Sequence, residues 1–195
     1  MKTKKKEPVI YIILKPIACF FFRIIMFPKV SCNSNIPKNG RVVLAGNHTK
    51  SLDCFMVMMS TGRCIHFLAK SDIFKPGFLN MFFHSAGLIP VHRERKDPDA
   101  LRSAKEYLNE DRVIGIFPEG RTNKTDEEIL PLKMGAVKMA SDTGSPIVPF
   151  AIKGKYIPFC SKIEIKFGEP YYLTEDLETE NIKLREKIRE VLHSM

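Results

Sequence analysis

The chain has 195 residues, of which 44% are apolar and 27% charged, enough for one domain with a hydrophobic core and too few for two. This composition excludes a disordered chain, and five cysteines without a C-x-x-C pair exclude a disulfide scaffold and predict reduced thiols in the cytosol. The net charge is +9, but residues 1–30 carry +6 and the other 165 residues only +3, which argues against a nucleic-acid binder and favours contact with anionic lipid.

A strongly apolar segment, Val9–Phe27, follows the cationic start of the chain. Its 19 residues just suffice to cross a bilayer, but Lys15, Pro16 and Arg23 interrupt them. Inserting its Val, Ile, Leu and Phe residues contributes about −4 to −7 kcal/mol, and the two cations cost about +5 to +7 kcal/mol. The net free energy of spanning the membrane is therefore close to zero. A spanning segment would also place the following domain outside the cytosol.

We therefore expect residues 1–30 to form a helical attachment segment at the membrane interface, and residues 31–195 to form the folded domain. The segment either lies in the interface or dips into one leaflet. Pro16 is expected to break or kink its helix, and Lys15 and Arg23 to extend toward lipid headgroups. The alternative is a buried helix of a soluble core.

After a polar connector, Ser31–Gly40, short apolar runs alternate with segments of helical character. This alternation predicts a single α/β domain with a mostly parallel or mixed sheet flanked by helices. The predicted buried strands are Arg41–Ala45, Cys64–Leu68, Leu88–Val91, Val113–Phe117 and Ile147–Ile152. The predicted intervening helices are Leu52–Ser60, Pro76–Ala86, Pro98–Asn109 and Lys133–Ser141.

The C-terminal part of the chain adds one strand and one helix. Lys162–Phe167 alternates polar and apolar residues, which predicts an edge strand, and Asn181–His193 predicts an amphipathic helix. The residues expected on the core face of this helix are Ile182, Leu184, Ile188, Val191 and Leu192. In such folds ligands bind where loops leave the carboxyl ends of strands, so the polar residues there are candidates for function.

The first of these loops places His48 and Asp53 five positions apart on a turn that leads into a helix. Five positions on a regular helix separate two side chains by about 140°, so the turn must fold back if the two are to meet. Asp53 would then hold the proton of one ring nitrogen and leave the other free to accept a proton from a hydroxyl group. No enzymic serine accompanies the pair, so we expect the hydroxyl to belong to a substrate. A helix N-cap beside a surface histidine is the alternative.

A second loop, Phe117–Asn123, follows the predicted strand at 113–117. Its Pro and Gly favour a tight turn, Glu119 can orient a hydroxyl group or hold a cation, and its amides can meet an anion. Three cations, Lys70, Arg93 and Arg121, each follow a predicted strand. They are candidates for binding a phosphate, or else ordinary surface cations. The spacing of Cys and His residues predicts no tight metal site.

Four ordered motifs resemble those of the glycerolipid acyltransferases, a family that includes the lysophosphatidate acyltransferases. The match covers about residues 40–152, and a further stretch between the first two motifs also resembles the family. The segments are Asn47–Asp53 (N-H-x-x-x-x-D), Lys70–Phe74 with Pro76 (K-x-E-L-F-x-x-P), Gly87–Arg93 (a strand ending in Arg), Phe117–Gly120 (F-P-E-G) and Ile147–Phe150 (V-P). Gly120-Arg121-Thr122 departs from the G-T-R of many members.

The resemblance implies an O-acyltransferase that moves a fatty acyl group from acyl-CoA or acyl-ACP to the free hydroxyl of 1-acyl-glycerol 3-phosphate, giving phosphatidic acid in phospholipid biosynthesis. The acyl thioester is a co-substrate, and no other cofactor is implied. His48 becomes the general base and Asp53 its orienting group. Substrate binding falls to Lys70, Arg93, Glu119, Gly120 and Arg121.

The expected partners are a lysophospholipid, the acyl carrier and a membrane surface. A cytosolic donor and a membrane acceptor place the enzyme on the cytoplasmic face of the cell membrane, as a peripheral or monotopic protein. Three alternatives remain open: glycerol 3-phosphate as acceptor, another lysophospholipid as acceptor, and a lipid-binding protein without catalysis.

Overall fold

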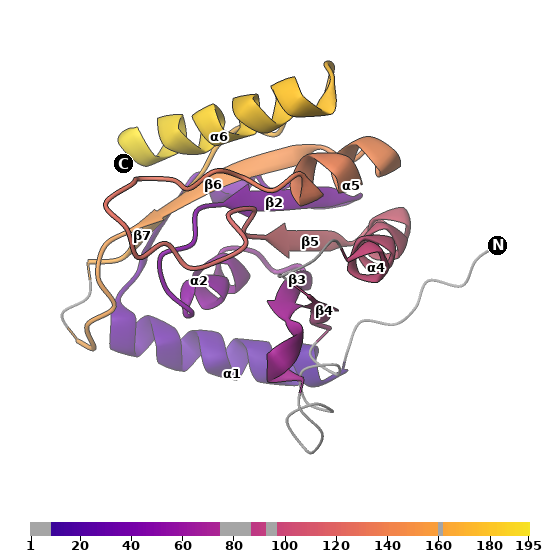
Figure 1. Ribbon diagram of the computed structural model, residues 1–195. Helices are drawn as coiled ribbons and strands as arrows, with labels where there is room; N and C mark the ends of the chain where they lie inside the picture. Colours follow the sequence, from indigo (N-terminus) through magenta and orange to yellow (C-terminus); the bar gives the residue numbers. More distant parts are fainter. Residues whose placement is uncertain (1–8, 75–86, 93–96, 160–161) are drawn as a thin grey trace.

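A seven-stranded sheet forms the middle layer of the fold, in the order β1-β7-β6-β2-β5-β3-β4 (Figure 1). The computed structural model describes residues 9–74, 87–92, 97–159 and 162–195. Strands β6, β2, β5, β3 and β4 run parallel, whereas β7 runs antiparallel to β6 and carries β1 beside it. The strands are β1 (Lys29–Ser31), β2 (Val42–Gly46), β3 (Ile65–Lys70), β4 (Ile89–Val91), β5 (Val113–Ile116), β6 (Ile147–Lys153) and β7 (Glu164–Phe167).

Helices cover both faces of the sheet (Figure 1). Helices α4, α5 and α6 pack on one face, and α2 packs on the other with α1 outside it. The helices are α1 (Val9–Met26), α2 (Asp53–Met59), α4 (Pro98–Asn109), α5 (Gly135–Thr143) and α6 (Leu177–His193), and short 3-10 turns lie at Asn33–Asn35 and Ser71–Ile73. The predicted α/β domain with flanking helices is confirmed.

The central strand β2 shows how the sequence specifies this layering. Every residue of β2 is buried, because helices cover both faces of the sheet there. Successive side chains point to opposite faces, so Val43 and Ala45 pack under α4, α5 and α6, and Val42 and Leu44 pack on the side of α2. The continuous apolar run follows from this double burial.

The five predicted buried strands are confirmed to within two residues at each end. The predicted helix at 98–109 has the predicted bounds, and those at 52–60 and 133–141 differ by one or two residues at each end. The predicted helix at 76–86 lies wholly outside the described residues.

The prediction that Lys162–Phe167 lies at the edge of the sheet is wrong. Strand β7 lies between β6 and β1, and Lys29–Ser31 forms the edge by pairing with Glu164–Lys166. The alternating pattern arises because one face of β7 packs on the core, where Ile165 and Phe167 are buried, while the other face is more open. A three-residue strand such as β1 leaves no comparable pattern in the sequence.

Helix α6 begins earlier than predicted, and one of its expected core residues is exposed. Leu184, Ile188 and Val191 form the buried stripe, whereas Ile182 is 66% exposed. Two positions along a helix correspond to about 200°, so Ile182 and Leu184 cannot both face the core. Asp176 caps the helix by accepting hydrogen bonds from the amides of Glu178 and Thr179.

Helix α1 continues through Pro16, so of the predicted break or kink the break is wrong and the kink stays a prediction. Lys15 points inward: its Nζ donates to the carbonyls of Thr61 at 2.6 Å and Arg63 at 2.8 Å, which replaces the predicted contact with headgroups. The outer side of α1 carries exposed apolar side chains at Ile12, Ile13, Ile17, Phe20, Phe21 and Ile24. Among the described residues, no helix combines the length and the apolarity that crossing a membrane requires.

Candidate active site

The loops that follow the parallel strands meet at one edge of the sheet. Strand β2 leads into the turn before α2, β5 leads into Phe117–Asn123, and β6 leads into the segment Gly154–Phe159. Because these strands are neighbours and parallel, their carboxyl ends bring together residues that are far apart in the sequence.

His48 and Asp53 meet at this edge. The His48 Nδ1 atom lies 3.0 Å from Asp53 Oδ2, and both residues are buried, with 7% and 0% of their surfaces exposed. The turn folds back because the amides of Thr49 and Lys50 donate to the same Asp53 oxygen, at 2.6 and 2.8 Å. An acceptor beside Nδ1 assigns the ring proton to that nitrogen and leaves the lone pair of Nε2 available.

The other carboxylate oxygen of Asp53 has a partner that sequence reasoning missed. The Tyr156 hydroxyl donates to Asp53 Oδ1 at 2.5 Å, and Thr49 Oγ1 donates to the same oxygen at 3.2 Å. Burial first, and then the charge of Asp53, raises the pKa of Tyr156, so the phenol stays protonated and remains a donor. The sequence carried one indication of this role, because Tyr156 lies just after the strand predicted at 147–152, where functional residues are expected.

Glu119 fixes the backbone around His48. Its Oε1 accepts from the His48 amide at 2.7 Å and its Oε2 from the Leu130 amide at 3.0 Å, while the Asn123 amide donates to the His48 carbonyl at 2.7 Å. Burial raises the pKa of Glu119, and the two amides that donate to its carboxylate partly oppose that shift. The loop after β5 thus binds both backbone polar groups of His48.

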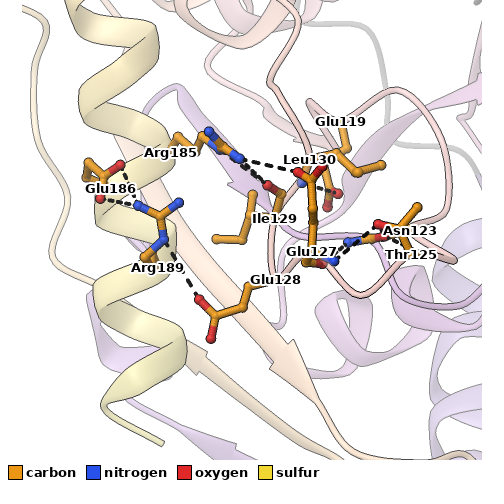
Figure 2. A network of polar contacts seen from close by, with 10 residues as sticks. All are labelled: Glu119, Asn123, Thr125, Glu127, Glu128, Ile129, Leu130, Arg185, Glu186 and Arg189. Atoms are coloured by element: carbon orange, nitrogen blue, oxygen red, sulfur yellow. Dashed lines mark hydrogen bonds and ion pairs between the residues drawn. The ribbon is translucent and has the colours of Figure 1, made fainter.

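The same loop is anchored on its far side by α6 (Figure 2). The Arg185 guanidinium donates twice to the carbonyl of Ile129, at 3.2 and 2.6 Å, and the Asn123 side chain donates to the carbonyl of Glu127 at 2.6 Å. Helix α6 therefore supports the segment whose Leu130 amide binds Glu119.

Phe117 and Gly120 shape the turn beside the imidazole. The Phe117 ring stacks on the His48 ring, with centroids 4.2 Å apart and planes 16° apart. The Gly120 amide donates to the Phe117 carbonyl at 3.0 Å, and Gly120 has a φ of +72° that favours glycine. A Cβ atom on Gly120 would lie 2.7 Å from Lys133 Cε, but the end of that flexible side chain can move, so the positive φ is the main reason for glycine here.

Comparisons with known proteins identify the family of the chain. Residues 28–153 match the family model described as Acyltransferase. The chain belongs to the acyltransferase family. A Bacillus subtilis protein named 1-acyl-sn-glycerol-3-phosphate acyltransferase is 30% identical over 151 residues, 74% of this chain and 73% of that protein. A Borreliella burgdorferi protein of the same name is 30% identical over 168 residues, 85% of this chain and 67% of that protein.

A solved structure shows the same fold as the acyltransferase described here. The crystal structure of the 1-acyl-sn-glycerophosphate (LPA) acyltransferase from Thermotoga maritima superposes with a TM-score of 0.74 at 24% identity. The match covers 94% of this chain and 77% of that one. The family model and the two named relatives confirm the predicted family and reaction class, and the solved structure confirms the fold.

The cations predicted to bind phosphate are placed differently in this acyltransferase. Lys70 ends β3 at the same edge of the sheet and forms an ion pair with Asp72. Arg121 directly follows Gly120 and is exposed. Arg93 lies outside the described residues. The structure therefore brings His48, Asp53 and Glu119 together, and places Lys70 at the end of β3 and Arg121 in the loop after β5, at the same edge of the sheet.

Cys54 of the acyltransferase directly follows Asp53 of the His48–Asp53 dyad in the sequence, but its thiol is not activated as a nucleophile. Burial first, and then the charge of Asp53, raises the pKa of the Cys54 thiol to about 12. The thiol is therefore protonated at neutral pH, and only the thiolate is strongly nucleophilic. This argues against an acyl-enzyme intermediate on Cys54.

Proposed function

We propose that the chain transfers a fatty acyl group from acyl-CoA or acyl-ACP to the free hydroxyl of 1-acyl-glycerol 3-phosphate, giving phosphatidic acid for phospholipid biosynthesis. The names of the relatives support this acceptor. The observation that carries the proposal is the buried contact between His48 and Asp53, which leaves Nε2 as a base.

In the proposed reaction, His48 Nε2 accepts the proton of the acceptor hydroxyl while its oxygen attacks the thioester carbonyl. Asp53 holds the Nδ1 proton and stabilises the imidazolium that forms. When the tetrahedral intermediate collapses, the C–S bond breaks and the proton on Nε2 passes to the departing sulfur. The reaction needs neither a metal nor a cofactor, because the thioester is already an activated acyl donor.

We assign recognition of the acceptor phosphate to Lys70 at the end of β3, to Arg121 in the loop after β5, and to Arg93, which lies outside the described residues. Glu119 and Gly120 act in acceptor binding by shaping the loop beside His48. Both Glu119 oxygens accept backbone hydrogen bonds, which supports an indirect part for this side chain over direct contact with the acceptor.

The enzyme meets its acceptor at a membrane surface through α1. The exposed apolar side of this helix and the excess of cations in residues 1–30 suit an anionic lipid interface. A donor carried by CoA or acyl carrier protein is cytosolic, so the protein rests on the cytoplasmic face as a peripheral or monotopic protein.

An acceptor panel tests the function. Purified protein with liposomes receives acyl-CoA or acyl-ACP together with 1-acyl-glycerol 3-phosphate, glycerol 3-phosphate or another lysophospholipid, and mass spectrometry identifies the lipid product. We expect phosphatidic acid from the first acceptor. Transfer only to another acceptor would replace the proposed substrate, and no transfer with any pair would favour a lipid-binding protein without catalysis.

The His48→Ala variant tests the proposed base in the same assay. Loss of a general base costs about 10²–10⁴-fold in rate, so we expect product formation to fall by at least that range while the melting temperature stays near that of the wild type. Undiminished turnover would contradict the assignment of His48.

A further inference from the structure

The segment after β6, Gly154–Phe159, brings the Tyr156 hydroxyl to the carboxylate of the dyad. Its 2.5 Å hydrogen bond to Asp53 Oδ1 joins residues 103 positions apart. On the basis of the proposed function, we propose that Tyr156 is a positioning residue of this acyltransferase that acts through Asp53. It holds the carboxylate so that Oδ2 faces the imidazole.

The hydrogen bonds of Asp53 show why this contact matters. Oδ2 accepts from the His48 ring and from two amides of its own turn, all within 3.0 Å. Oδ1 accepts from Tyr156 and, at 3.2 Å, from the Thr49 hydroxyl. Tyr156 therefore supplies the shorter of the two bonds to Oδ1, and it comes from a separate strand exit. Without it Oδ2 keeps its three hydrogen bonds within 3.0 Å, but Oδ1 keeps only the longer bond from the Thr49 hydroxyl, so the carboxylate is held less firmly.

The tyrosine itself is held from two directions. The amide of Phe159 donates to the Ile25 carbonyl of α1 at 2.7 Å, which anchors the far end of the segment. The Tyr156 ring packs against Phe22 of α1, with centroids 6.4 Å apart, and Phe22 stacks on Phe55 of α2 at 5.9 Å. Helix α1 thus supports the residue that orients Asp53.

The start of the segment requires a glycine. Gly154 has a φ of +107°, and a Cβ atom there would collide with the carbonyl of Lys162. The backbone therefore turns sharply just after β6 and carries Tyr156 back toward α2. Together with the Phe159 anchor, this turn gives the phenol a fixed approach to the dyad.

The Tyr156→Phe variant tests the proposal by removing one oxygen atom. One hydrogen bond to a charged group corresponds to about a 10- to 100-fold change in rate, so kcat should fall by that range while KM for donor and acceptor stays within about twofold. Tyr172→Phe is the matched control, because Tyr172 is 64% exposed and adjoins Tyr171, which pairs with Ile147 at the opposite end of β6. Its kcat should equal that of the wild type.

A double-mutant cycle separates positioning through Asp53 from a direct contact with substrate. In an Asp53→Ala background, measured at high enzyme concentration, adding Tyr156→Phe should change kcat by less than about twofold. A further tenfold loss in that background, or an unchanged kcat in Tyr156→Phe alone, would overturn the proposal. If the wild type transfers no acyl group at all, the proposed function fails instead. Melting temperatures of all variants show that each is folded.

Discussion

At the scale of single residues, Glu119 joins two backbone segments by accepting one amide hydrogen bond on each oxygen. In Glu119→Gln, one side-chain N–H group would face a backbone N–H group, and one buried bond would be lost. We expect this to destabilise the fold by about 1–3 kcal/mol and to lower kcat, because the His48 amide loses its support. Thermal unfolding and the transfer assay measure the two effects.

The matched control is Glu169→Gln. Glu169 is exposed, so this substitution makes the same chemical change at the surface of the protein. Its stability and kcat should stay within about 0.5 kcal/mol and twofold of the wild type. A Glu119 variant as stable and as active as this control would show that the two amide contacts do not support the site.

Gly120 allows a second test at this scale. Gly120→Ala places a Cβ at a φ of +72° and 2.7 Å from Lys133 Cε. Because the lysine side chain can move, the backbone cost dominates, and we expect a loss of about 1–2 kcal/mol in unfolding free energy. Gly62→Ala is the control, since Gly62 has an ordinary φ and nothing within 4 Å of its added Cβ. Equal losses in the two variants would contradict the requirement for glycine at position 120.

The sequence predicted the His48 and Asp53 contact but not the rest of their surroundings. His48 and Asp53 lie only five positions apart, so their spacing is visible in the sequence. In the structure two amides of the same turn donate to Asp53 and hold the turn closed. Tyr156 reaches Asp53 only because β6 lies beside β2, and Lys15 turns inward only because α1 packs near the end of α2. Such contacts depend on which elements become neighbours, and a single sequence does not state this.

At the scale of elements, the N-terminus of α6 gives a prediction about pH. The side chain and the amide of Thr179 donate to Asp176 and hold the pKa of that carboxyl below its usual value. A lowered folded pKa means that this stabilisation is present above the unfolded pKa of about 3.9 and is lost as pH falls through the folded value. Asp176→Ala should therefore lower the melting temperature at pH 7, and the difference from wild type should shrink below pH about 4.

Asp176→Asn is the control for that experiment. Asparagine is also a good N-cap, so it should retain most of the stability at pH 7. Its side chain does not titrate, so the residual difference from wild type should also narrow in acid. A gap between wild type and Asp176→Ala that stays constant from pH 7 to pH 3 would contradict the role of the ionised carboxylate.

The elements that sequence patterns predicted best are those with the strongest local signals. Helix α4 has Pro98 in its first turn and Asp97 as N-cap, and its predicted bounds hold. Strand β1 has three residues and depends on β7 for its hydrogen bonds, so it carries no periodicity of its own. The sequence pattern therefore predicted β7 as the edge strand, although β1 occupies the edge in the structure.

At the scale of the whole molecule, α1 and the segment after β6 link the outer surface to the dyad. Apolar side chains are exposed on α1, at Phe27, and at Ile157 and Phe159 in the segment that the Phe159 amide ties to the Ile25 carbonyl. Phe22 and Tyr156 of the same elements pack against each other. The surface proposed to meet lipid and the residue proposed to orient Asp53 therefore both depend on the packing of α1 against the segment after β6. Charge and apolarity predict the attachment segment from the sequence, and its contact with lipid stays a prediction. Its packing against α2 came only with the fold.

A liposome experiment tests this proposed surface. Phe20 and Phe21 are 61% and 57% exposed on α1, so replacing both with Glu should leave the melting temperature unchanged. If these rings enter the interface, each substitution removes about 1.5–3 kcal/mol of apolar burial, and partitioning into anionic vesicles should fall at least about tenfold. Ile182→Glu is the control, because Ile182 is 66% exposed on α6, across the sheet from α1 (Figure 1). Flotation of the double variant together with the vesicles, as strong as that of the control, would show that α1 is not the membrane-binding face.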